Sequence, residues 1–177
     1  MIQVKINKAG WEYDIHSLVK AFYPEETVKV LTPESVEKKP AEKPLQTFTI
    51  TVEEKQKFGL KITDPAGTVA DETVFPINYD VRLNAKTTIK KELYGMLKKR
   101  TGKELPWGTL TGIRPTKIAM TMLEEGKEEA EVAAFFKQEH YVSQEKTELA
   151  IDIAKREKAI LSQITHDGYS LYIGIPF

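Results

Sequence analysis

The chain has 177 residues, of which 41% are hydrophobic and 29% charged, with 26 basic and 26 acidic side chains. A chain of this length can bury about 70% of its unfolded surface, enough for one domain or two small ones. The zero net charge provides no long-range field for nucleic acid or an anionic membrane, and no apolar run of about 18 residues is present to span a bilayer. The absence of cysteine excludes disulfides and thiolate metal sites. The N-terminus lacks the apolar core of a signal peptide, which indicates a cytoplasmic location.

Residues 1–83 predict an α+β unit. Residues 2–6 alternate as one strand, with three apolar side chains on one face. A helix follows, capped by Asp14 and ended by Pro24, which has no N–H to continue it. Its apolar side chains have helical spacing: Ile15, Leu18, Val19 and Phe22. Residues 28–31 form a second short strand.

The remainder of this first unit predicts further strands. Residues 33–44 are rich in Glu, Lys and Pro and indicate a flexible loop or linker. Residues 47–52 alternate strictly as a strand, and residues 58–63 are the expected hairpin partner. A turn at 64–67 precedes another strand around 73–75. We therefore expect a small antiparallel sheet with one covering helix.

Residues 84–168 predict a helical segment, because the hydrophobic period changes from two to about 3.6. Gly102 is placed to end the first helix, and Pro115 to begin the second. A third helix spans about 128–139, and Ser143 caps a fourth and longer one. Burial is expected of Val132, Ala133 and Phe136 in the third helix. The other apolar positions that mark these helices are Ile89, Leu93, Met96, Leu97, Ile118, Ala119, Met122, Leu123, Ile153, Ile160 and Ile164.

Two segments carry a resemblance to a known family. Residues 169–177 form a short apolar strand that contains Tyr-Ile-Gly-Ile-Pro-Phe, and residues 106–117 read Pro-Trp-Gly-Thr-Leu-Thr-Gly-Ile-Arg-Pro-Thr-Lys. In this order they resemble radical S-adenosylmethionine enzymes of the oxygen-independent coproporphyrinogen III oxidase (coproporphyrinogen dehydrogenase) family. The resemblance covers roughly residues 90–177. It implies that residues 169–177 are the first strand of a catalytic barrel.

The resemblance implies a truncated enzyme. In the family, a loop with three cysteines follows this strand and binds a 4Fe-4S cluster, which in turn binds S-adenosylmethionine. The chain stops at Phe177, before any cysteine, so we expect no cofactor, metal or catalytic residue in the fragment itself. The parent would be an oxidoreductase that acts on the propionates of coproporphyrinogen III in haem biosynthesis, or a relative that inserts or guards haem. Tyr172 matches the tyrosine that contacts the methionine cofactor, although Gly174 stands where the oxidases often have histidine.

Arg114 and Lys117 are the candidate substrate- or anion-binding residues. They flank Pro115, at a predicted helix start where free N–H groups favour anions. A carboxylate or phosphate would be held partly by the guanidinium group. The alternative is a structural turn in which Arg114 pairs with an internal acid or carbonyl.

A cluster of cations marks residues 86–103, and no catalytic constellation accompanies it. A solvated helix face explains the cluster better than a nucleic-acid surface, because the chain is neutral and few aromatic residues are interleaved. The cluster consists of Lys86, Lys90, Lys91, Lys98, Lys99, Arg100 and Lys103. The histidines are isolated and form no zinc or nucleophile–base pattern: His16, His140 and His166.

Three hypotheses follow from the sequence. In the first, the chain is the accessory N-terminal module of a radical S-adenosylmethionine oxidoreductase, and its partner is the missing C-terminal barrel. In the second, the basic helix at 86–103 and the β-rich segment bind RNA or a protein. In the third, residues 1–83 only position the rest of the enzyme.

Overall fold

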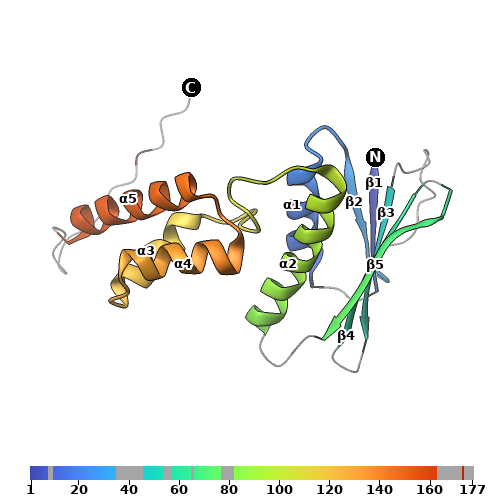
Figure 1. Cartoon of the computed structure of the whole chain (residues 1–177), viewed down its shortest axis with the longest axis horizontal. Coiled ribbons are helices and arrows are strands. Elements are labelled where there is room, and N and C mark those ends of the chain that lie inside the picture. The colour runs from blue at the N-terminus through green and yellow to red at the C-terminus, as the bar shows by residue number, and fades with distance from the viewer. Residues whose placement is uncertain are drawn as a thin grey trace.

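The computed structural model describes residues 1–7, 10–34, 46–53, 57–64, 66–76, 82–162 and 173. Two units lie side by side in Figure 1. The sheet unit contains the strands and two helices, and the helical unit contains three further helices. The junction segment, residues 102–114, connects them. The predicted α+β class is therefore confirmed.

The sheet is mixed rather than antiparallel. Its strands are β1 (Ile2–Ile6), β2 (Val28–Leu31), β3 (Gln46–Glu53), β4 (Lys57–Thr63) and β5 (Val69–Pro76), in the order β2-β1-β3-β4-β5. β1 is parallel to both β2 and β3, whereas β3, β4 and β5 are antiparallel neighbours. The expected small antiparallel sheet is wrong at β1 because helix α1 (Glu12–Phe22) is a crossover connection, which makes the strands on either side of it parallel.

Helix α1 begins differently from the prediction. Its N-cap is Trp11, without a side-chain cap, and Asp14 lies inside the first turn. Asp14 instead pairs with Lys86 at 2.8 Å, so the prediction that Asp14 caps the helix is wrong. The predicted apolar face is confirmed, since all four of its side chains are fully buried: Ile15, Leu18, Val19 and Phe22.

Helix α2 (Arg82–Thr101) packs on the same side of the sheet as α1 (Figure 1). Its buried side chains Ala85, Ile89, Leu93, Tyr94, Met96 and Leu97 belong to the core that β1, β3, β4 and α1 form. The sequence placed this helix in the segment 84–168, but its core joins it to the sheet. The sheet therefore has two covering helices, and Gly102 ends the second as predicted, with φ +67°.

The helical unit has its own core. It consists of α3 (Pro115–Glu124), α4 (Glu129–His140) and α5 (Gln144–Leu161). Small side chains allow close packing, with Ala119, Ala150 and Ala154 fully buried beside Val132 and Phe136.

The prediction that Ser143 caps α5 is confirmed, because its Oγ accepts a hydrogen bond from the Lys146 N–H at 3.3 Å. Ile160 lies in this helix as predicted and is 64% exposed, because α5 buries the stripe of Thr147, Ala150, Ile151 and Ala154. The predicted loop at 33–44, Ile164 and the strand at 169–177 lie outside the described residues, apart from Pro33, Glu34 and the exposed Ile173.

Gly108 is where the junction segment contacts the end of α4. The Thr109 N–H donates to the His140 carbonyl at 2.8 Å, and the Ser143 N–H donates to the Pro106 carbonyl at 2.9 Å. Gly108 has φ +53°, and a Cβ there would overlap the His140 carbonyl oxygen and approach the Tyr141 carbonyl carbon to 2.7 Å. This close contact between two backbone segments requires glycine.

We predict that Gly108→Ala destabilises the chain by about 3 kcal/mol or more, because both the left-handed φ and a backbone clash oppose the new methyl group. Gly102→Ala is the matched control: its φ is +67° but nothing lies within 4 Å of the position that the new methyl group would take, so the cost is about 1 kcal/mol. Urea unfolding of the two variants measures the difference. Equal losses would contradict the close contact.

Candidate functional site

The predicted residues Arg114 and Lys117 line one cavity of about 430 Å³ between α3 and the C-terminal end of α5. Arg114 is the extended N-cap of α3, and Pro115 takes the first helical position. Two carboxylates and four less polar residues complete the lining: Glu124, Glu157, Met120, Thr121, Ile160 and Leu161. The structure therefore brings the two predicted cations together, whereas Tyr172 lies outside the described residues.

This surface, which we call the Arg114 cavity, is amphipathic. Both Arg114 and Lys117 are exposed, and neither forms an ion pair within the described part of the chain. Ile160 and Leu161 beside them are 64% and 53% exposed. Exposed apolar side chains next to cations suit contact with a protein surface or an amphipathic anion.

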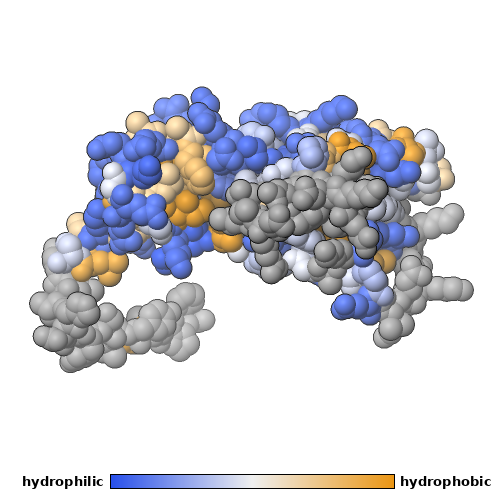
Figure 2. Space-filling model, turned by 90° about the horizontal axis from the view of Figure 1, so that it is seen from below, coloured by the Kyte–Doolittle hydropathy of each residue, from blue (hydrophilic) through white to orange (hydrophobic). Residues whose placement is uncertain are grey.

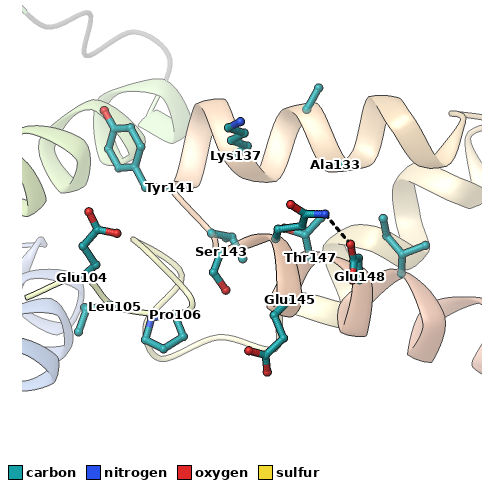
Figure 3. Close-up of a pocket in the computed structure, with 14 residues that line it drawn as sticks. Glu104, Leu105, Pro106, Ala133, Lys137, Tyr141, Ser143, Glu145, Thr147 and Glu148 are labelled. Atoms are coloured by element: carbon teal, nitrogen blue, oxygen red, sulfur yellow. Dashed lines mark hydrogen bonds between the residues drawn. The ribbon is translucent and has the colours of Figure 1, made fainter.

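A larger cavity of about 800 Å³ lies between the junction segment, α4 and the first turns of α5 (Figure 3). Its apolar lining comes from three separate stretches of sequence: Leu105, Pro106, Ala133, Ala134, Tyr141, Val142 and Ile151. Figure 2 shows hydrophobic residues gathered over the helical unit on the face seen from below. Sequence reasoning missed this cavity because no local motif joins its walls. Its volume is in the range of small-molecule sites.

Four polar side chains that line the larger cavity have partners within the chain. Glu104 pairs with Lys98, and Glu145 pairs with Lys146 at 3.1 Å. The Gln144 side chain donates to Glu148 at 2.9 Å (Figure 3). Its apolar lining suits the cavity to holding an apolar group.

Tyr141 stands at the edge of this cavity in a strained backbone conformation. It is the one non-glycine residue with positive φ in the described chain, at 56°. Its ring packs on Tyr94, with 5.4 Å between ring centroids, and the Lys91 ammonium lies 5.6 Å from its ring centroid. These contacts offset the cost of the conformation, on the order of 1 kcal/mol.

His140 is a half-buried histidine at the end of α4. Its Nδ1 lies 3.0 Å from the Thr109 hydroxyl. Burial, followed by the nearby Lys90, lowers the pKa of His140 to about 4, with Glu139 opposing the shift. No group of three or more His, Cys, Asp or Glu residues within the described chain is placed to hold a metal ion.

The seven cations at 86–103 all have contacts within the chain. Four form ion pairs with Asp14, Glu139, Glu104 and Asp71, namely Lys86, Lys91, Lys98 and Lys99. Lys103 donates to the Phe22 carbonyl at 3.3 Å, Arg100 lies beside the Tyr23 hydroxyl, and Lys90 is buried. These positive charges are therefore used in contacts within the fold, whereas a nucleic-acid surface would need to present them to phosphate groups.

Part of the chain is similar to a much longer known protein. No family model matches the chain. It is 36% identical, over 94 residues, to the "oxygen-independent coproporphyrinogen-III oxidase-like protein HemZ" of Bacillus subtilis (strain 168). The match covers 52% of this chain and 19% of that protein. The match supports the family resemblance that the motifs predict. No helix among the described residues is long and apolar enough to cross a membrane.

We predict that acid destabilises this chain partly through His140. Its folded pKa of about 4 lies below the ordinary value of 6.5, so the unfolded chain takes up a proton first and stability is lost as the pH falls from 6.5 towards 4. His140→Gln should reduce the fall in Tm over this range by about 3 °C or more. His16→Gln, on α1, is the control. An equal response of both variants to acid would contradict the assignment.

Proposed function

We propose that this chain is the N-terminal accessory module of a radical S-adenosylmethionine oxidoreductase that acts on a porphyrinogen, in the cytoplasm, during haem biosynthesis. The observation that carries the proposal is the 36% identity to part of an oxidase-like protein, together with the two motifs in the family's order. The chain has no cysteine, so its own residues do not fit a 4Fe-4S cluster. The cluster and its barrel would belong to polypeptide beyond Phe177.

The Arg114 cavity is the face that we propose for contact with the catalytic barrel. It lies at the end of α5, and its exposed Ile160 and Leu161 side chains would be buried by a partner surface. Arg114 and Lys117 would meet carboxylates, either of the barrel or of the substrate. Tyr172 would contact the methionine cofactor within the first barrel strand.

The function is tested with the complete protein, encoded by the natural gene, reconstituted anaerobically with iron and sulfide. We expect it to cleave S-adenosylmethionine and to decarboxylate coproporphyrinogen III, whereas the 177-residue chain alone binds no iron and converts nothing. Cofactor cleavage without porphyrinogen turnover would favour a haem-handling relative. A natural reading frame that ends at Phe177 would overturn the proposal.

We predict that Ile160→Asp in the complete protein lowers turnover by about tenfold, because a charge is placed in a buried contact. The same substitution should leave the Tm of the 177-residue chain unchanged, since Ile160 is 64% exposed there. Val74→Asp, at a side chain that is 57% exposed on β5, is the control and should alter neither quantity. Wild-type turnover of the Ile160 variant would exclude this face as the contact.

A further inference from the structure

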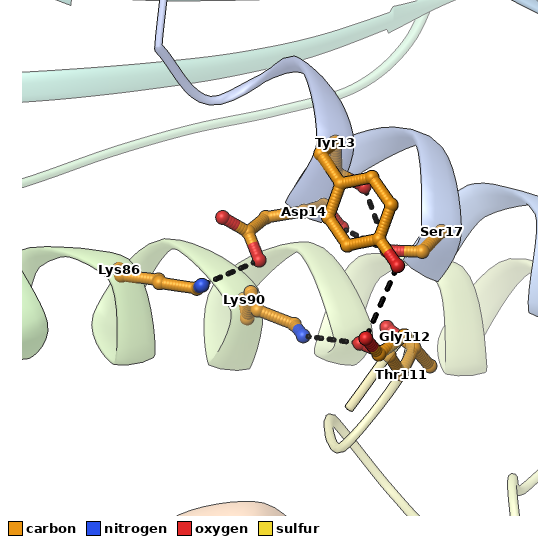
Figure 4. Close-up of polar contacts among 7 residues, drawn as sticks. All are labelled: Tyr13, Asp14, Ser17, Lys86, Lys90, Thr111 and Gly112. Atoms are coloured by element: carbon orange, nitrogen blue, oxygen red, sulfur yellow. Dashed lines mark hydrogen bonds and ion pairs between the residues drawn. The ribbon is translucent and has the colours of Figure 1, made fainter. Parts of the chain in front are cut away.

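A polar cluster lies where α1, α2 and the junction segment meet (Figure 4). Asp14 comes from α1, Lys86 and Lys90 come from successive turns of α2, and Thr111 comes from the turn before α3. The Tyr13 hydroxyl closes one side by donating to the Gly112 carbonyl at 3.1 Å. None of these contacts is used in the function proposed above.

Lys90 is the unusual member of the cluster. It is 6% exposed, and its Nζ makes one long contact, 3.5 Å to the Thr111 carbonyl oxygen. Burial lowers the pKa of Lys90 to about 8, with Asp14 opposing the shift and Lys86 adding to it. An ammonium carries three N–H donors, so two of them have no acceptor in the described chain.

Asp14, the carboxylate beside Lys90, is paired with another lysine, and so is Glu139, which neighbours His140. Asp14 lies 2.8 Å from Lys86, and Glu139 lies 3.3 Å from Lys91. His140, the remaining titratable neighbour, is neutral at pH 7. Lys90 therefore leaves the cluster with one uncompensated positive charge, which is costly in a buried position.

The Thr111 hydroxyl supplies a second unsatisfied group. Its Oγ1 is buried and has no hydrogen-bond partner among the described residues, although the backbone of the same residue accepts the Lys90 contact. A buried hydroxyl without a partner is rare in folded proteins. The Lys90 ammonium and the Thr111 hydroxyl thus both have unused donors, and the ammonium lies 3.5 Å from the carbonyl oxygen of the residue that carries the hydroxyl.

We propose that Lys90 Nζ and the Thr111 hydroxyl bind one small oxyanion, a carboxylate or phosphate group, with Lys86 at the exposed rim. An oxyanion accepts hydrogen bonds from both unused donors and cancels the uncompensated charge. A cation would not fit, because the cluster is already positive, and a water molecule would leave the charge in place. The bound group would hold the turn that leads to Arg114. This site does not depend on the proposed function.

The test uses the purified 177-residue chain, with inorganic phosphate and acetate as probes at constant ionic strength. We expect at least one of the two anions to raise the Tm saturably at pH 7, by about 3 °C at tenfold excess over Kd. The comparison of phosphate with acetate identifies the anion class. The rise should fade above about pH 8, where Lys90 loses its proton.

Three variants locate the effect. Thr111→Val removes the unused hydroxyl without removing a hydrogen bond, so it should leave the Tm unchanged or higher yet weaken anion binding about tenfold. Lys90→Met should abolish the response. Lys91→Met, whose lysine is paired with Glu139, is the matched control and should respond like the wild type.

Three results would overturn the inference. A rise of equal size in all four proteins would be a general salt effect, and no rise with either anion would mean that water satisfies these groups. A response that Thr111→Val leaves intact would place the anion elsewhere, whether or not the Lys90 variant folds.

Discussion

Backbone packing between the junction segment and the end of α4 joins the sheet unit to the helical unit. Gly108 lies against the His140 carbonyl, and hydrogen bonds of 2.8 Å and 2.9 Å connect Thr109 to His140 and Ser143 to Pro106. A side chain at position 108 has no room, so the arrangement depends on glycine. One wall of the larger cavity and the turn before Arg114 both belong to this segment. The larger cavity therefore depends on the meeting of these two backbones.

Local features of the fold could be predicted from the sequence because their causes are local. Residues 28–31 form a strand as predicted, and Ser143 caps α5 because its hydroxyl needs only the N–H three residues on. The parallel pairing of β1 could not be predicted from alternation, since an alternating strand fits either direction. The docking of α2 on the sheet was missed for the same reason: its apolar face is equally suited to helices or strands.

Among the candidate sites, too, those with a local cause could be predicted and those built from distant segments could not. Arg114 and Lys117 could be found from the sequence because a turn before Pro115 places two cations close together along the chain. The larger cavity could not, because its walls come from residues 104–106, α4 and α5. In the sequence, Lys90 cannot be distinguished from the other cations among the seven at residues 86–103. Only the structure separates it, since its neighbours pair with carboxylates while Lys90 is buried without one in the described chain.

Because Lys90 is buried, the stability of the chain depends both on pH and on the binding of an anion. With a folded pKa of about 8 against 10.5, its contribution to stability is present above pH 10.5 and lost as the pH falls through 8. At neutral pH the buried charge therefore opposes folding. With an oxyanion bound, the charge on Lys90 favours folding instead, because the anion stabilises the charged form and raises the pKa of Lys90. Proton uptake and anion binding then support each other, and both act on the turn that presents Arg114.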